Sequence, residues 1–239
     1  MWWLATKFVT AKRNVSLMMH REIEITRDGS NTVAIPELNV TYHSRHGAVQ
    51  ESRHIYIEAA LQYALPTIKT DTVSVFEMGF GTGLNALLTL QDATKLGRKI
   101  DYYAIELYPL TLEESGALKY DNQLGTGHLL MQLHQAAWGE PVCINEYFTI
   151  NKSLQSLLNI NISKCFDVIY FDAFAPTVQP ELWTEEVFKL MYALTNTNGV
   201  LVTYSSKVSV RKALQAAGFW VEKIRGPIGK AEITRAIKK

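Results

Sequence analysis

The sequence predicts an α/β fold with a mostly parallel, Rossmann-like sheet, and three observations predict it. A buried strand pattern, a glycine-rich turn and a helical pattern follow one another over residues 72–88. Strand and helix patterns then alternate along the chain, and two strand patterns around a Gly-Pro-Ile-Gly turn close it. The 239 residues, 47% apolar and 20% charged, leave room for a seven-stranded sheet with one antiparallel strand and a small N-terminal β-hairpin extension.

The chain is expected to divide into three parts. Residues 1–21 show no hydrophobic period and are expected to form a loose tail, dispensable up to a second possible start at Met18. Residues 22–70 are expected to hold a hairpin, a loop rich in His and Arg, and a helix. Residues 71–239 are expected to form the main α/β domain.

Each element of the second and third parts has a local signal. Alternating residues over 22–27 and 32–35 predict the hairpin, and Ser52 is a candidate cap for a helix that runs to Leu65. Periodicity and turn residues predict the remaining elements: strands at 73–76, 99–105, within 143–150, 166–171, 200–204, 219–224 and 232–237, and helices from 84, over 180–194 and over 208–217.

The glycine turn indicates the ligand class. Gly79, Gly81 and Gly83 follow the strand at a spacing of two, so the backbone can approach a ligand closely. The turn lacks the Gly-Lys-Ser/Thr ending of phosphate-binding loops, and its spacing differs from the dinucleotide fingerprint. Glu77, two residues before the first glycine, favours a cationic ligand, which points to S-adenosylmethionine.

Three acids end three predicted strands, at the edge where open α/β sheets bind their ligands. Glu77 is expected to contact the cofactor, although an acid there can also serve as a helix-dipole partner. Glu106 lies at the distance typical of a carboxylate that binds ribose hydroxyls, or it is a surface acid. Asp172 begins the segment Asp-Ala-Phe-Ala-Pro. A carboxylate there can orient an amine and accept its proton, and the alternative is a loop acid or a helix cap.

Charge and cysteine content limit the possible partners. The net charge is +1, but nine Lys/Arg against two Glu lie between Lys207 and Lys239, which indicates an anionic partner or a solvated face. The histidines of the 42–54 loop lack the spacing of metal ligands, so no metal is expected. No stretch is long and apolar enough for a membrane span, and Cys143 and Cys165 are expected to stay reduced in a cytoplasmic protein.

Three motifs together resemble the methyltransferase domain of the MnmC/MnmD family. They are Glu-Met-Gly-Phe-Gly-Thr-Gly-Leu-Asn at 77–85, Asp-Ala-Phe-Ala-Pro-x3-Pro-Glu-Leu-Trp at 172–183, and Ser-Arg-His-Gly-Ala-x2-Glu-Ser-Arg-His at 44–54. The resemblance extends over about residues 22 to 236. It implies a class I methyltransferase fold and methylation of the aminomethyl group on the wobble uridine of tRNA. It also implies the stand-alone type without flavin, with separate enzymes supplying the amine.

Carried over by position, the resemblance implies roles for individual residues. Asp172 would be catalytic and would also contact the cofactor, together with Glu77, Gly79, Phe80, Gly81, Thr82, Gly83, Asn85 and Glu106. Substrate binding, to the tRNA anticodon stem-loop, is expected from Phe174, Pro176, Arg45, His46, Lys207 and Lys230. The acid that many such enzymes offer to the adenine is missing, because Asn151 and Lys152 follow the third strand instead.

Two other functions stay open at this stage. The same crevice suits a methyltransferase for a small amine or an enzyme similar to the aminopropyltransferases, which need no basic surface. A binding module without catalysis is the third option, and the Asp172 segment disfavours it. RNA affinity that depends on salt would separate a tRNA enzyme from a small-amine enzyme.

Overall fold

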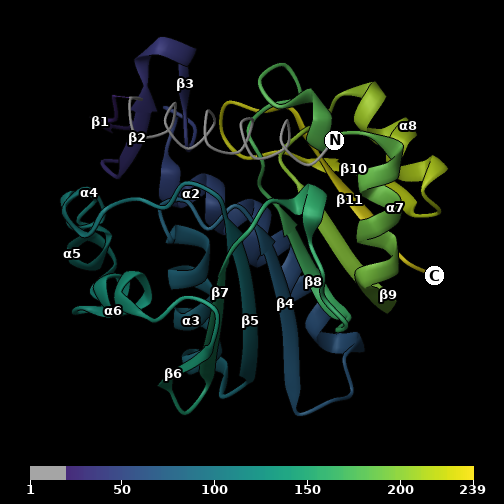
Figure 1. Ribbon diagram of the computed structural model, residues 1–239, viewed down its shortest axis with the longest axis horizontal. Coiled ribbons are helices and arrows are strands. Elements are labelled where there is room, and N and C mark those ends of the chain that lie inside the picture. The colour runs from purple at the N-terminus through teal and green to yellow at the C-terminus, as the bar shows by residue number, and fades with distance from the viewer. Residues whose placement is uncertain (1–19) are drawn as a thin grey trace, which may run out of the picture.

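The computed structural model describes residues 20–239, so the predicted tail and the start at Met18 lie outside the described residues. The described residues form one large and one small β-sheet (Figure 1). The large sheet has eight strands in the order β10-β11-β9-β8-β4-β5-β7-β6. In chain order they are β4 (Thr72–Met78), β5 (Lys99–Glu106), β6 (Pro141–Asn145), β7 (Phe148–Leu154), β8 (Phe166–Phe171), β9 (Thr195–Thr203), β10 (Trp220–Arg225) and β11 (Glu232–Ile237).

The strand directions confirm the predicted fold class. Strands β7, β5, β4, β8 and β9 pair in parallel, and β11 lies antiparallel between β9 and β10. The additional strand is β6, which pairs antiparallel with the edge strand β7. The prediction of one strand within 143–150 was therefore incomplete. The Asn145 side chain accepts a hydrogen bond from the Tyr147 amide at 2.9 Å, and this local turn divides the segment into a hairpin.

Helices cover both faces of the large sheet, and β4 shows why. Val73 and Val75 face one hydrophobic cluster, while Phe76 belongs to the other, so both faces of this central strand are apolar. The first cluster packs under the helices between residues 48 and 135, and the second packs under α7 and α8. The helices are α3 (Leu84–Leu96), α4 (Leu112–Ala117), α5 (Tyr120–Leu124), α6 (Leu129–Gln135), α7 (Glu185–Leu194) and α8 (Val208–Ala216), with short 3-10 helices η3 (Leu65–Thr67), η4 (Leu157–Asn159) and η5 (Pro180–Leu182).

The N-terminal extension forms three strands instead of a plain hairpin. Strands β1 (Glu22–Ile25) and β2 (Asn31–Ile35) pair as predicted, and the two-residue strand β3 (Val40–Thr41) follows the 3-10 helix η1 (Pro36–Leu38) and pairs with β2. This sheet lies at the end of the large sheet where the parallel strands finish (Figure 1). The division of the chain at residue 70 stays a prediction, because the extension also contributes to the cavity described below.

The helix of the extension begins earlier than predicted. It starts at Ala48 in α2 (Ala48–Ser52) and continues as the π-helix η2 (Arg53–Gln62), so Ser52 lies inside the helix and is not its cap. The first amides are instead bound from the distant β1–β2 turn. Ser30 Oγ accepts from the Ala48 amide at 3.0 Å, and Asp28 Oδ2 accepts from the Gln50 amide at 3.0 Å. A cap supplied by tertiary contact leaves no local sequence signal.

The segment predicted as one helix over 180–194 is also divided. Pro180 begins the short helix η5, and Thr184 caps α7 by accepting a hydrogen bond from the Val187 amide at 3.3 Å. Trp183, between the two helices, is buried in the second cluster, as expected of a core residue. Helix α8 ends at Ala216, and Gly218 follows two residues later with a φ of +108°, which only glycine adopts readily.

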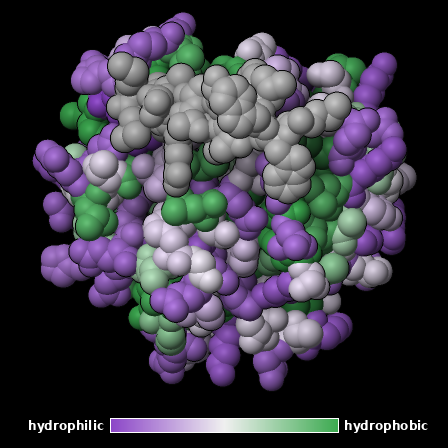
Figure 2. All heavy atoms as spheres, viewed as in Figure 1, coloured by the Kyte–Doolittle hydropathy of each residue, from purple (hydrophilic) through white to green (hydrophobic). Residues whose placement is uncertain are grey.

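The surface and the helix lengths fit the composition. The face drawn in Figure 2 is hydrophilic along most of its outline, and its hydrophobic residues form separate patches. Within residues 20–239, no helix has the length and apolar character that a bilayer crossing requires.

Candidate active site

A cavity of about 590 Å³ lies at the carboxyl ends of the parallel strands. Four regions line it: the glycine turn after β4, the strand ends and loops after β5, β7 and β8, the extension, and the segments after β9 and β10 that carry Tyr204 and Lys230. Its volume is within the range of small-molecule sites, about 300–1,000 Å³. The placement agrees with the rule that ligands of open α/β sheets bind outside the strand ends.

The glycine turn is held by the neighbouring strand. The amides of Gly79 and Phe80 both donate to the Ile105 carbonyl at 3.1 Å, and the Gly81 amide donates to Glu106 Oε2 at 3.0 Å. Gly81 has a φ of +50°, and a Cβ placed there would lie 3.1 Å from the ring of Tyr42. The turn therefore needs glycine both for its backbone conformation and for the approach of the extension.

Glu106 lines the cavity as predicted, and its carboxylate also organises the loop after β5. Oε1 accepts from the amides of Leu107 and Tyr108, both at 2.8 Å, while Oε2 accepts from Gly81. Oε2 makes only this one bond among the described residues, so it has a lone pair available for a ligand hydroxyl. The carboxylate fits the expected ribose contact, which stays a prediction.

Asn85 connects the two other predicted acids. Its Nδ2 donates to Glu77 Oε1 at 3.0 Å and to Asp172 Oδ2 at 2.9 Å. Burial raises the pKa of the Glu77 carboxyl well above its ordinary value, and this residue, fully buried, is not among those that line the cavity. Its contact with the cofactor stays a prediction, and its carboxylate accepts a hydrogen bond from Asn85.

Asp172 faces the cavity from the end of β8. Burial raises the pKa of its carboxyl to about 6, while the hydroxyl of Tyr56, the amide of Asn85 and the ammonium of Lys230 act in the opposite direction. This carboxyl is therefore mostly ionised at neutral pH but remains a much better proton acceptor than an ordinary Asp.

The extension supplies a wall of the cavity that sequence reasoning missed. Tyr42 contacts the predicted substrate residue Phe174 edge-on, with ring centroids 5.2 Å apart. His43 Nε2 lies 2.7 Å from Thr82 Oγ1, and burial lowers the pKa of this imidazole to about 4. Tyr56 reaches the cavity from the π-helix η2. The only sequence signal for this wall was the density of His and Arg in the segment. The prediction drawn from it named Arg45 and His46 and not the residues that line the cavity.

The predicted substrate residues separate into groups. Phe174 and Lys230 line the main cavity, while Pro176 and Lys207 line an adjacent cavity of about 340 Å³ that shares Lys230. Lys230 Nζ lies 2.9 Å from Glu51 Oε1, so its charge is already paired within the wall. These four residues line two adjacent cavities, and their contact with one substrate stays a prediction.

Arg45 and His46 line neither cavity. The Arg45 guanidinium pairs with the Glu24 carboxylate at 2.7 Å on the surface of the small sheet. The ring of His46 packs against Gly229, where an added Cβ would lie 2.3 Å from the ring. Contact of either residue with a nucleic acid stays a prediction.

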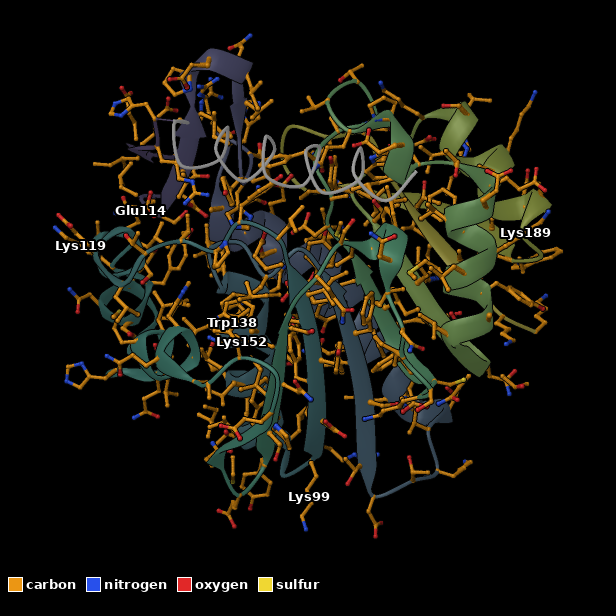
Figure 3. All side chains as sticks on the ribbon, viewed as in Figure 1. Lys99, Glu114, Lys119, Trp138, Lys152 and Lys189 are labelled. Carbon is orange, nitrogen blue, oxygen red and sulfur yellow. The ribbon has the colours of Figure 1, made fainter. Side chains whose placement is uncertain are left out.

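Lys152, which follows the third strand where an acid was missing, lies away from the cavity and contacts other groups of the protein. Its fully buried ammonium donates to the His134 carbonyl at 2.7 Å and lies 4.5 Å from the Trp138 ring centroid (Figure 3). Burial lowers its pKa to about 8. His134 Nε2 in turn lies 3.0 Å from the Thr82 carbonyl. Lys152 therefore supports the glycine turn through His134. Gln155 and Ser156, after β7, line the cavity instead.

Within residues 20–239, no group of three or more His, Cys, Asp or Glu side chains could hold a metal ion. The groups that line the cavity include aromatic rings, a glycine turn, the carboxylates of Glu106, Asp172 and Glu181, and the Lys230–Glu51 ion pair. This set can bind a ligand with hydroxyls and a positive charge, and it can accept a proton at Asp172.

Comparisons with known proteins indicate the ligand class and the fold. Residues 148–239 match a family described as S-adenosyl-L-methionine-dependent methyltransferases. The tRNA 5-methylaminomethyl-2-thiouridine biosynthesis bifunctional protein MnmC of Methylobacillus flagellatus is 30% identical over 196 residues, which is 77% of this chain. The chain spans 30% of that relative.

Solved structures show the same fold. The crystal structure of MNMC2 from Aquifex aeolicus superposes with a TM-score of 0.71 and 26% identity, over 91% of this chain and 70% of that one. Spermidine synthase from Thermotoga maritima superposes with a TM-score of 0.59 and 12% identity, over 92% and 69%. The second likeness concerns the fold alone.

Proposed function

We infer that this chain, as a member of the MnmC family of S-adenosylmethionine-dependent methyltransferases, methylates the aminomethyl group on the wobble uridine of tRNA. The observation that carries the proposal is the meeting of Asp172, the 79–83 turn and Glu106 around one cavity. The MnmC relative and the MNMC2 structure support the tRNA substrate.

The residues of the cavity fit S-adenosylmethionine. Glu106 has a lone pair for a ribose hydroxyl, and the turn brings backbone close to the ligand without side chains. Asn85 Oδ1 is buried without a partner among the described residues and borders the cavity, so it can accept a hydrogen bond from an ammonium group. When bound, the cofactor supplies an electrophilic methyl group on a sulfonium.

Asp172 is the proposed catalytic residue. Its carboxylate orients the amine of the uridine and takes the proton that the nitrogen must lose, and its raised pKa favours that transfer at neutral pH. Most of the rate enhancement then comes from holding the amine in line with the methyl group. Asn85 fixes the carboxylate through its bond to Oδ2, so the acceptor is already in place.

Several finer expectations belong to the same proposal. The substrate is the anticodon stem-loop, other enzymes supply the aminomethyl group, and a tRNA substrate suits the cytoplasmic location expected from the sequence. The roles of Phe174, Pro176, Lys207 and Lys230 at the uridine are also part of it. The alternative small-amine enzyme gains no support, because the likeness to spermidine synthase concerns only the fold.

Mass spectrometry of wobble nucleosides from cells that lack this protein tests the proposal. We expect the aminomethyl nucleoside to accumulate and its methylated form to disappear. The unaltered gene should restore the methylated form, and a gene encoding Asp172→Asn should not. Methylated nucleoside at the original level in the deleted strain would contradict the assignment.

A further inference from the structure

Tyr56 lies beside the proposed catalytic carboxyl without a function assigned to it. It is carried by η2, where the helix is wound as a π-helix, a form that is frequent at functional sites. Its side chain is 2% exposed and lines the cavity. Burial raises the pKa of its hydroxyl well above the ordinary value, and the charge and the hydrogen-bonding oxygen of the Asp172 carboxyl raise it further.

The Tyr56 hydroxyl makes no well-aligned hydrogen bond among residues 20–239, although it lies close enough to the Asp172 carboxyl for the two groups to shift each other's pKa. By contrast, the hydroxyls of the buried Tyr170 and of Thr89 are 3.1 Å apart, and the half-buried Tyr204 donates to the Ala173 carbonyl at 2.9 Å. Even when the Tyr56 hydroxyl turns its proton towards Asp172, its oxygen keeps a lone pair that no described residue uses. This acceptor at the edge of the cavity points to an N–H group of a ligand as its partner.

We propose that Tyr56 is a specificity residue that recognises the primary amine of the substrate, an inference that rests on the function proposed above. A primary amine offers more than one N–H group. Asp172 takes one of them, and the oxygen of Tyr56 accepts a second, which leaves the lone pair of the nitrogen free to face the methyl group. A uridine without the aminomethyl group offers nothing to this oxygen.

Equilibrium binding tests the proposal without turnover. Two anticodon stem-loops, one with 5-aminomethyluridine and one with uridine, are titrated into the protein in the presence of S-adenosylhomocysteine. Tyr56→Phe should reduce the preference for the aminomethyl RNA about tenfold while leaving affinity for the uridine RNA unchanged, as expected for one lost hydrogen bond. The melting temperature should not fall, because the hydroxyl makes no well-aligned hydrogen bond within the described part of the protein.

Tyr102→Phe is the matched control. Tyr102 is also fully buried, and its hydroxyl also lacks a well-aligned partner among the described residues and lies beside a buried carboxyl, that of Glu77. It does not line the cavity. Loss of the Tyr102 hydroxyl should leave the preference between the two RNAs unchanged.

The outcomes separate this proposal from the proposed function. If both RNAs weaken in parallel with Tyr56→Phe, if Tyr102→Phe has the same effect, or if the melting temperature falls, Tyr56 does not read the amine. If the unaltered protein shows no preference between the two RNAs but still transfers methyl groups, only the role of Tyr56 is overturned. If it shows neither a preference nor methyl transfer, the proposed function is overturned as well.

Discussion

The rate of methyl transfer should depend on the ionisation of Asp172. Burial raises the pKa of this carboxyl from 3.8 to about 6, with Glu51 adding to the rise and Lys230 opposing it. The residue must be ionised to accept a proton, so activity is present above this pKa and is lost as the pH falls through it. With a pKa near 6, about a tenth of the carboxyls are ionised at pH 5 and about nine tenths at pH 7.

The predicted change is therefore about tenfold between pH 7 and pH 5 from this group alone. An Asp with its ordinary pKa would be about nine tenths ionised at pH 5 and would show almost no change. Single-turnover rates with saturating cofactor and RNA, measured from pH 5 to 8, give this profile. The amine of the substrate titrates too, so the control is Asp172→Asn, in which only the titration of the amine remains.

We expect Asp172→Asn to lower the rate by about 10² to 10⁴ and to bind the cofactor within about tenfold of the original affinity. The acid limb centred near pH 6 should be missing from its profile. If the variant kept that limb, or if the unaltered enzyme remained fully active at pH 5, Asp172 would not be the proton acceptor.

Three further predictions concern the walls of the site. Glu106→Ala should weaken cofactor binding by about 1.5–3 kcal/mol in calorimetry, and an unchanged affinity would move the ribose contact elsewhere. Gly83→Ala should destabilise the fold more than Gly97→Ala in urea unfolding, because both have positive φ but only the Cβ at Gly83 would meet neighbouring side chains; equal losses would refute this. Lys207→Glu should reduce the salt slope of tRNA binding by about one unit at most, and equal slopes for it and Lys189→Glu, on the exposed face of α7, would refute a phosphate contact.

The elements with strong local signals could be predicted from the sequence. The strand–turn–helix unit of β4 and α3 and the closing β10–β11 pair follow from side-chain periodicity and glycine positions, and both are present. The start of α2 could not be predicted, because its amides are bound by the distant Ser30 and Asp28. The same applies to β6, which one short turn separates from β7.

The candidate site was predictable only where residues follow a parallel strand. Glu106 and Asp172 were found because strand ends meet at one edge of the sheet, and both line the cavity. Tyr42 and Tyr56 were missed because they reach the cavity by packing of the extension, which no spacing in the sequence encodes. Glu77 was placed by the same rule as Glu106, yet it lies within β4, level with Ala104 of β5, and its side chain is fully buried.

The central claim is methyl transfer to the amine of a wobble uridine. The most direct measurement incubates the purified protein with isotopically labelled S-adenosylmethionine and two stem-loops that differ only in the aminomethyl group, then identifies the labelled nucleoside by mass spectrometry. We predict one labelled methyl group on the exocyclic nitrogen of the aminomethyl RNA, and no label in the uridine RNA. Label on a base or ribose atom in both RNAs, or no label in either, would contradict the account.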